Sequence, residues 1–402
     1  MGIVIVIFAF TNISNNTISI FLMKIILLVL FFFIIYLTKK NEQVTIINFS
    51  FIIYYFILIF LSGATLLYST NLHYGVSKFV NLIINVPILF SFKFFYDSFN
   101  KTKSDIIIYS AIIVSLILFF IFLFFNPFDQ ITAYKFSLLR WSHVTFSRVF
   151  SFIFLYLLFV FTYSKNKKLS YLLSIALSLI FYELYFASLR AAIIGLIIFL
   201  VIFCFYYIKY KILSKEKIIL LLTSFLISFL LIITFSNNKV VENRYQEIAN
   251  LTHNEIKTNS GINARLIAYK KSVEIIKKNW LLGIGLGAFK GYNNDEFLDW
   301  IRYPHNIFLE FQIELGLMGT IFFLFYLIKT FNVLKEIDFF VLLTWLYALW
   351  LAMFAKDISS NLIVFIPLIF YGNPYSIDKL KEFFIPNKNS GVLSGNSSEI
   401  SE

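Results

Sequence analysis

The sequence predicts an all-α integral membrane protein with about 12 transmembrane helices and one large external loop that contains an amphipathic helix. Three observations support this prediction. Of the 402 residues, 59% are hydrophobic, and the mean hydropathy is +0.82. Charged residues make up 14% of the chain, whereas soluble domains carry about a quarter. The apolar residues also gather in runs of about 20, which is the length that crosses a hydrocarbon core.

Eleven apolar runs are candidates for these helices. They are residues 18–37, 49–68, 76–96, 105–125, 147–163, 169–187, 191–208, 217–236, 305–328, 338–354 and 358–371. The last run is short and contains Pro367, so we expect a kink there. Residues 3–12 form a shorter run, and whether it is a true span is open. Counting it gives 12 spans, with both chain ends on the same side of the membrane.

Lysine and arginine predict the orientation. The formal net charge of +12 would suggest a nucleic-acid partner in a soluble protein. Here, however, the short loops on one side hold 12 Lys and Arg residues and those on the other side hold four. The positive-inside rule places the richer side in the cytoplasm, so we expect no nucleic-acid partner. The long loop then lies in the periplasm, and the protein is expected in the bacterial inner membrane.

The chain is expected to divide into four parts. Residues 1–236 form an N-terminal bundle of about nine spans, 237–304 the large periplasmic loop, 305–371 three C-terminal spans, and 372–402 a polar cytoplasmic tail. Within the loop, apolar residues recur at spacings of three and four from Leu266 to Trp280. This pattern predicts an amphipathic helix on the membrane surface or across the mouth of the bundle, with Asn263 as its N-cap. Glycines 283, 285 and 287 then predict a flexible turn.

One of only four histidines, His305, lies in the run Tyr303-Pro-His-Asn306, where the loop returns to an apolar helix. An imidazole suits a general base near neutral pH. On one continuous helix His305, Gln312, Gly316 and Gly319 would share a stripe about 60° wide, and the glycines would let a neighbouring helix come close. A histidine at a helix start with two packing glycines explains the same spacing.

Four arginines are expected on the same outer side of the membrane. They are Arg140, Arg148, Arg190 and Arg265. Guanidinium groups that converge there would suit a phosphorylated or pyrophosphorylated lipid head group, because each planar fork binds two oxyanions. For Arg190 alone, a snorkelling surface anchor is an equal alternative, and for any other of these arginines alone a solvated surface charge is the better explanation. Only their common side favours a binding site. Glu183 lies seven residues before Arg190 inside a span, which predicts either an ion pair or a polar cavity.

Several kinds of site are absent from the sequence. There is no GxxxxGK[ST] loop, and glycines 283–287 do not fit GxGxxG. There is no HExxH motif or paired-histidine spacing, and Asp295, Glu296 and Asp299 are carboxylates of an exposed loop, which are usually only solvated. The single cysteine, Cys204, excludes an intrachain disulfide and a cysteine metal cluster. We therefore expect no cofactor and no metal, and a substrate that is already activated.

The spacing around His305 resembles a family signature. His305-Asn306, nine residues, and then Gly316-x-x-Gly319 resemble the His-Asn-x9-Gly-x-x-Gly pattern of the O-antigen ligase and polymerase superfamily. Residues 279–289, with Gly283 and Gly285, resemble the family's P-L-x-G-x-G-x-x-x-F stretch. The specific part of the resemblance covers residues 260–320, and the other spans match only in number and hydropathy.

Two further motifs match less closely. Ser188-Leu-Arg190 resembles a Ser-Arg element with one residue inserted. Arg265 opens the loop helix as in the family's R-x3-L motif, but Tyr269 stands where that motif has Leu.

The resemblance implies a GT-C-like, inverting glycosyltransferase. Its donor would be a glycan on undecaprenyl diphosphate, which needs no nucleotide or metal. His305 would accept the proton of the acceptor hydroxyl, and Arg265 and Arg190 would bind the diphosphate. Further site residues would be Tyr303, Asn306, Arg140 and Arg148 for substrate binding, and Gly283, Gly285, Gly316 and Gly319 as the structural motif.

The motifs leave the acceptor open. An O-antigen ligase would transfer the glycan to a lipid A-core sugar, and a polymerase would transfer it to another lipid-linked repeat unit. A flippase for lipid-linked oligosaccharides is a third interpretation. A flippase would be expected to carry charges within its spans and to have no elaborate outer loop, and this sequence shows the reverse. A purely structural membrane protein would leave the motifs unexplained.

Overall fold

A computed structural model describes residues 50–97, 101–125, 135–136, 141–187, 189–235, 261–292, 301–354 and 356–370. Within these ranges the regular structure is helical, apart from two strands of two residues each. Strands β1 (Lys135–Phe136) and β2 (Trp141–Ser142) pair antiparallel. The all-α class is therefore confirmed for the described residues. The expected spans 3–12 and 18–37, and the tail 372–402, lie outside them.

The long helices follow the expected apolar runs closely. They are α3 (Ser50–Leu66), α4 (Leu72–Asp97), α5 (Lys101–Phe125), α6 (His143–Tyr163), α7 (Lys167–Ala187), α8 (Arg190–Lys209), α9 (Lys215–Phe235), α11 (Gly261–Asn279), α12 (Ile307–Ile337) and α13 (Phe339–Ala352). In the described part of the chain, six helices are long and apolar enough to cross a membrane, and three further apolar helices are shorter. The chain is thus a membrane protein.

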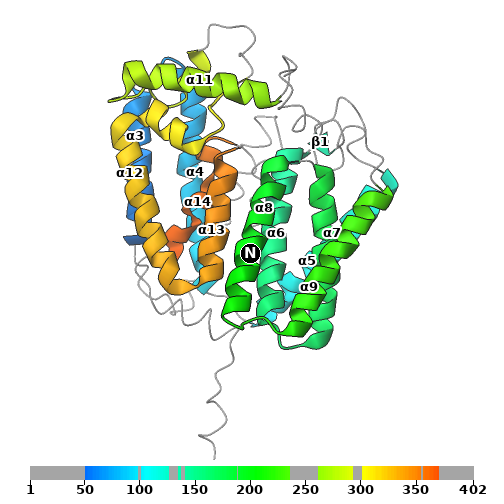
Figure 1. Cartoon of the computed structure of the whole chain (residues 1–402). Coiled ribbons are helices and arrows are strands. Elements are labelled where there is room, and N and C mark those ends of the chain that lie inside the picture. Colours follow the sequence, from blue (N-terminus) through cyan, green and yellow to red (C-terminus); the bar gives the residue numbers. More distant parts are fainter. Residues whose placement is uncertain are drawn as a thin grey trace, which may run out of the picture.

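The helices stand in two groups with α11 across one end (Figure 1). Helices α5 to α9 form one group, which we call the scaffold group. Helices α3, α4 and α12 and residues 356–370 form the other, which we call the site group. Helix α13 joins them, because its buried face packs into the core of the scaffold group while Ala352 at its end reaches the core of the site group. The α6–α7 and α8–α9 connections, which carry the lysines expected in the cytoplasm, lie at the end opposite α11.

The scaffold group has an aromatic core with hydroxyl groups between its helices. Phe146 and Phe150 stack at 4.2 Å between ring centroids. Ser228 on α9 donates to the carbonyl of Ser178 on α7 at 2.9 Å, and Ser174 donates to the carbonyl of Leu220 at 3.0 Å. Small hydroxyl residues let membrane helices approach closely and add hydrogen bonds between them. These contacts hold α7 against α9.

The last expected span, 358–371, is not one helix as far as it is described. It consists of η4 (Ile358–Ser360), α14 (Leu362–Phe365) and η5 (Ile366–Phe370). Asn361 interrupts it with φ −98° and ψ 35°. Pro367 lacks the N–H that an α-helix would use, which explains the tighter turns after residue 365. The prediction of a kinked span is therefore wrong for residues 358–361, which form a polar turn.

Helix α11 presents small residues to the bundle and large apolar residues outward. It begins at Gly261, two residues before the expected N-cap Asn263, so that prediction is wrong. Ala268, Ser272 and Ile275 are buried, whereas Leu266 and Trp280 are 44% and 54% exposed. Three members of the apolar stripe seen in the sequence, Leu266, Val273 and Trp280, thus face outward, as a helix on a membrane surface requires, whereas Ile276 packs against the protein.

The turn after α11 is buried, which corrects the expected flexible turn. Gly283, Gly285 and Gly287 have φ of 74°, 96° and 76°, a region that favours glycine. A Cβ on Gly285 would lie 2.6 Å from Cα of Ser69, and one on Gly287 would lie 2.6 Å from the backbone nitrogen of Gly75. These glycines let the turn pack directly on the connection between α3 and α4.

Gly316 breaks α12 instead of receiving a neighbouring helix. Its φ of 66° and ψ of −158° are non-helical, and the chain around it pairs with the turn after α11. Leu317 donates to the carbonyl of Leu281 at 3.0 Å, and Ile284 donates to the carbonyl of Ile313 at 2.8 Å. The expectation of helix packing at this glycine is therefore wrong. The break lets the two family motifs hydrogen-bond backbone to backbone.

Candidate functional site

His305 stands just before α12 and not on it. Asn306 is the N-cap, and its side chain accepts from the N–H of Phe308 at 3.0 Å and of Leu309 at 3.2 Å. His305 has φ 59°, a left-handed conformation that non-glycine residues adopt infrequently. The expected stripe of His305, Gln312 and Gly316 along one helix is wrong for the histidine. Gln312 instead donates to the carbonyl of Trp280 at 2.6 Å.

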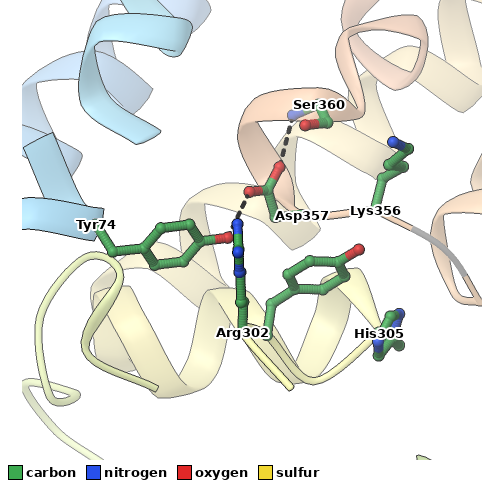
Figure 2. Close-up of a pocket in the computed structure, with 7 residues that line it drawn as sticks. Tyr74, Arg302, His305, Lys356, Asp357 and Ser360 are labelled. Carbon is green, nitrogen blue, oxygen red and sulfur yellow. Dashed lines mark hydrogen bonds between the residues drawn. The ribbon is translucent and has the colours of Figure 1, made fainter. Parts of the chain in front are cut away.

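His305 lines a cavity of about 370 Å³ at the α11 end of the molecule (Figure 2). Three separate segments form its wall: the start of α4, the residues before α12, and the turn after α13. The lining residues are Tyr74, Arg302, Tyr303, His305, Lys356, Asp357 and Ser360. Residues far apart in the sequence therefore meet at one polar site.

The imidazole of His305 is held in its neutral form. Its ring lies 4.4 Å from that of Tyr303 between centroids, and its buried Nδ1 has no hydrogen-bond partner among the described residues. Burial lowers the pKa of His305 to about 4, and the charge of Arg265 and, less strongly, that of Lys356 contribute. A neutral imidazole keeps a free lone pair, so it is able to accept a proton near pH 7.

Several cationic side chains converge around this histidine. Burial and the nearby charge of Arg190 lower the pKa of Arg265. Burial lowers the pKa of Lys356 to about 8, and the charge of Arg148 contributes. Groups that shift one another's pKa in this way lie close together. The arrangement concentrates positive charge where an anion would be stabilised.

Asp357 is the carboxylate among the residues that line this cavity, and both of its oxygens accept hydrogen bonds. It accepts from the hydroxyl of Tyr74 at 3.1 Å, the hydroxyl of Ser359 at 3.0 Å and the N–H of Ser360 at 2.9 Å. Burial opposes ionisation, but Lys78 and the hydrogen bonds of Ser360 and Ser359 outweigh it and hold the pKa of Asp357 below its usual value. Asp357 therefore stays ionised and caps the short helix η4.

Arg148 is buried, so it is not the solvated surface charge that was one of its two interpretations. It lies on α6, which begins at His143, and it is 1% exposed. Its Nη2 donates to Oδ1 of Asn361 at 2.6 Å, and Asn361 in turn donates to the carbonyl of Asp357 at 3.0 Å. Arg148 thus supports the turn after α13 from the scaffold group. Arg140 lies outside the described residues.

The expected pairing of Glu183 with Arg190 is not formed. Glu183 is 0% exposed, and neither of its carboxylate oxygens accepts a hydrogen bond within the described structure. Arg190 is the first residue of α8 and lies near Arg265.

The described residues contain no group of three or more His, Cys, Asp or Glu side chains that could hold a metal ion. Asp295, Glu296 and Asp299 lie outside the described residues.

Sequence reasoning missed the turn 356–361. Lys356 was counted as one of the few charges on the outer side, and Asp357, Ser359 and Asn361 were not singled out. One signal was available, because the polar residues 356–361 form a cluster between two apolar runs. A simple connection between two spans needs only a few solvated residues. Tyr74 on α4 carried no local signal, because its partner Asp357 is 283 residues away.

Residues 150–324 match the family model described as O-antigen ligase. This segment is an O-antigen ligase domain. It contains Arg190, Arg265, His305 and both glycines of the His-Asn-x9-Gly-x-x-Gly pattern, so the resemblance read from the motifs is confirmed. The family consists of membrane enzymes of ligase or polymerase type, which suggests lipid-linked glycans as substrates. No curated protein matches the chain.

Proposed function

We propose that this O-antigen ligase domain protein transfers a glycan from undecaprenyl diphosphate to a lipid A-core sugar at the periplasmic face. The observation that supports this most is the neutral His305 in a cavity beside buried cations, at the α11 end of the molecule. The twelve-span topology, the GT-C-like class and the location in the bacterial inner membrane are parts of the same proposal.

The proposed reaction is a single displacement with inversion. The acceptor hydroxyl oxygen attacks the anomeric carbon, and the bond from that carbon to the diphosphate breaks, with the electron pair leaving on the diphosphate oxygen. His305 takes the proton of the attacking hydroxyl. The pKa of His305 is about 4, so on its own it is a weak base. A bound diphosphate would offset the surrounding positive charge and raise this pKa towards the working pH.

Arg265 and Arg190 are proposed to bind the diphosphate and to stabilise the charge that grows on it as it leaves. Their mutual proximity supports this role, because the charge of Arg190 lowers the pKa of Arg265, and a bound diphosphate would be attracted to both guanidinium groups. Lys356, which lines the same cavity as His305, is added to this set. In this proposal cationic side chains carry the charge stabilisation, and no metal takes part.

The other substrate-binding candidates divide by their contacts. Tyr303 lines the cavity and keeps that role in the proposal. Asn306 uses its side-chain oxygen as a helix cap, and Arg148 acts through Asn361, so both are proposed to position neighbouring groups. For Arg140 the role stays a prediction.

A polymerase of the same superfamily is the alternative, because it needs the same histidine and arginine roles with another lipid-linked unit as acceptor. Glycolipid analysis of a deletion strain separates the two. A ligase predicts loss of all capped lipopolysaccharide, whereas core that carries a single repeat unit would establish the polymerase. A flippase predicts that the purified protein joins no glycan to any acceptor.

The orientation has its own test. An engineered cysteine at Lys277, an exposed position on α11, should react with a membrane-impermeant maleimide added from the periplasmic side. Reaction only from the cytoplasmic side would overturn the proposed topology.

A further inference from the structure

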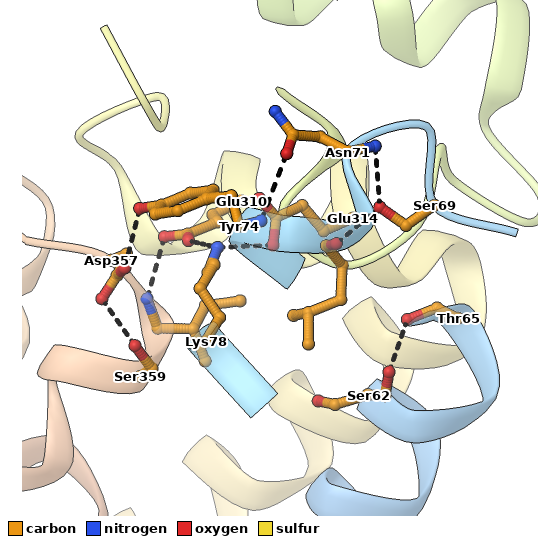
Figure 3. A network of polar contacts seen from close by, with 12 residues as sticks. Ser62, Thr65, Ser69, Asn71, Tyr74, Lys78, Glu310, Glu314, Asp357 and Ser359 are labelled. Atoms are coloured by element: carbon orange, nitrogen blue, oxygen red, sulfur yellow. Dashed lines mark hydrogen bonds and ion pairs between the residues drawn. The ribbon is translucent and has the colours of Figure 1, made fainter. Parts of the chain in front are cut away.

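The site group buries a lysine beneath the cavity. Lys78 on α4 is 1% exposed and forms ion pairs with Glu310 and Glu314, which lie one turn apart on α12 (Figure 3). Its Nζ lies 2.5 Å from Oε2 of Glu314, and it also contacts Oε1 of Glu310. None of these three side chains lines the cavity.

Glu310 differs from Glu314 in one respect. Its second oxygen, Oε2, accepts the backbone N–H of Ile358 at 3.1 Å. Ile358 follows Lys356 and Asp357, which line the cavity, so Glu310 joins α12 to the turn that carries them. Glu314 pairs with Lys78 and also interacts with the backbone of Gly287 in the turn after α11, and its Oε1 has no hydrogen-bond partner within the described structure. None of these contacts is a hydrogen bond to the turn 356–361.

One face of α4 holds the same turn at two more points. Tyr74 donates to Asp357 at 3.1 Å, and Asn85 donates to the carbonyl of Ser359 at 2.8 Å. At about 100° per residue, Tyr74, Lys78 and Asn85 fall within about 40° of one another on the helix. The three side chains thus form a line along α4 that faces residues 357–359.

Burying these charges is expected to contribute little net free energy to folding. Removing ions from water costs several kcal/mol each in general, and well-packed apolar residues often replace a buried ion pair without loss. Hydrogen-bonded networks of this kind do, however, hold a segment in one arrangement. The turn 356–361 has little regular structure of its own, and Lys356 has φ 67°, so its shape depends on such contacts.

We propose that Lys78 is a positioning residue, which orients Glu310 and through it holds the turn 356–361 so that Lys356 and Asp357 face His305. The effect on turnover rests on the proposed function, whereas the effect on the position of the turn does not.

The matched variants are Glu310→Gln and Glu314→Gln. Each removes one negative charge from the same helix and the same lysine. A glutamine at 310 replaces one acceptor oxygen with an NH2 group, which then faces a donor, either the N–H of Ile358 or Lys78. Lys78 keeps Glu314, so the N–H of Ile358 is the donor that is left unpaired when the remaining oxygen faces Lys78. We expect Glu310→Gln to lower kcat by about tenfold or more, since a buried donor is left unpaired, and Glu314→Gln to stay within about twofold.

The second readout measures the turn itself. In a Cys204→Ala background, Ser360→Cys places a thiol on the cavity wall, and its labelling rate with a maleimide reports whether the turn has moved. We expect Glu310→Gln to change this rate several-fold and Glu314→Gln to leave it unchanged. Asn85→Leu removes the hydrogen bond from Asn85 to the carbonyl of Ser359 and leaves the charged residues unchanged. It should change the labelling rate in the same direction as Glu310→Gln. It therefore replaces Glu310→Gln in the test if that variant fails to fold.

Equal effects of the two glutamine variants would overturn the proposal, as would a loss of turnover in Glu310→Gln without a change in labelling. If the purified protein transfers no glycan, the proposed function fails, but the labelling rates still decide the positioning role. Unchanged labelling in both Glu310→Gln and Asn85→Leu would then refute it.

Discussion

The scaffold group and the site group bury their polar residues in different ways. In the scaffold group most are hydroxyls that bond carbonyls of their own helix or of the helix beside it, such as Ser151 to Ser147 and Ser228 to Ser178. In the site group the contacts join segments far apart in the sequence, such as Lys78 to Glu310 across 232 residues. The first pattern supports helix packing, and the second fixes the geometry of a cavity.

Two charged residues of the scaffold group depart from this pattern: Arg148, which bonds to the distant Asn361, and Glu183. Glu183 is fully buried, and its oxygens accept no hydrogen bond within the described residues, whereas every buried carboxylate described in the site group has a partner. The comparison predicts that substitutions in the site group reduce turnover and that substitutions of the hydroxyl residues between scaffold helices act mainly on stability. Arg148 and Arg190 belong to scaffold helices but reach the site, so they are expected to behave like the site group.

Apart from His305 itself, the largest effect is expected at Arg265. Arg265→Lys keeps the charge but loses the planar fork, so we expect kcat/KM to fall by about 10² to 10³, the usual loss when one stabilising donor is removed. The assay uses the purified protein with a lipid-linked donor. Lys270→Gln, an exposed change on the same helix, is the control and should leave turnover unchanged. Full activity of Arg265→Lys would remove this arginine from the diphosphate site.

The next effect concerns the break in α12. A Cβ on Gly316 would lie 2.4 Å from the carbonyl oxygen of Leu281, and its φ of 66° disfavours other residues. We expect Gly316→Ala to lower stability by about 2 kcal/mol or more, measured by thermal unfolding in detergent, and to reduce turnover with it. Gly63→Ala is the control, because the nearest atoms lie 3.3 Å away on the Phe79 ring. Equal unfolding temperatures for the two variants would contradict the account of Gly316.

A smaller effect is expected from Lys356. Its pKa is about 8, so its charge is present below that pH and is lost as the pH rises through it. Donor binding should weaken accordingly, and kcat/KM of the wild type should fall above about pH 8. Lys356→Met should lower the plateau and abolish this alkaline limb. The proposal for Lys356 fails if the limb persists in the variant.

The smallest effect is expected in the scaffold group. Ser228→Ala removes the hydrogen bond to Ser178 between α9 and α7, and such bonds contribute about 0.6 kcal/mol in membrane proteins. Thermal unfolding should show a slight loss of stability with transfer activity unchanged. Thr234→Ala, an exposed hydroxyl bonded within its own helix, should change neither. A strong loss of activity in Ser228→Ala would contradict the division between the two groups.

Features encoded locally could be predicted from the sequence. Runs of about 20 apolar residues predicted α6 and α8 to within a few residues, and the period of three and four predicted α11. The motif spacing identified the family and drew attention to His305.

Features that depend on distant partners could not be predicted. The turn after α11 packs against the non-helical residue Gly316, and the residues around Gly316 do not predict this break in α12. The burial of Arg148 depends on its partner Asn361, which is 213 residues away in the sequence. The role of the turn 356–361 becomes visible only once α4, α6 and α12 surround it.

The most direct test of the account is transfer by His305→Ala, measured with purified protein, a lipid-linked donor and a core acceptor, together with donor affinity. The account predicts that transfer falls by about 10² to 10⁴, the usual contribution of a general base, while the donor still binds. Full transfer by His305→Ala would contradict the central claim that His305 is the base at this site.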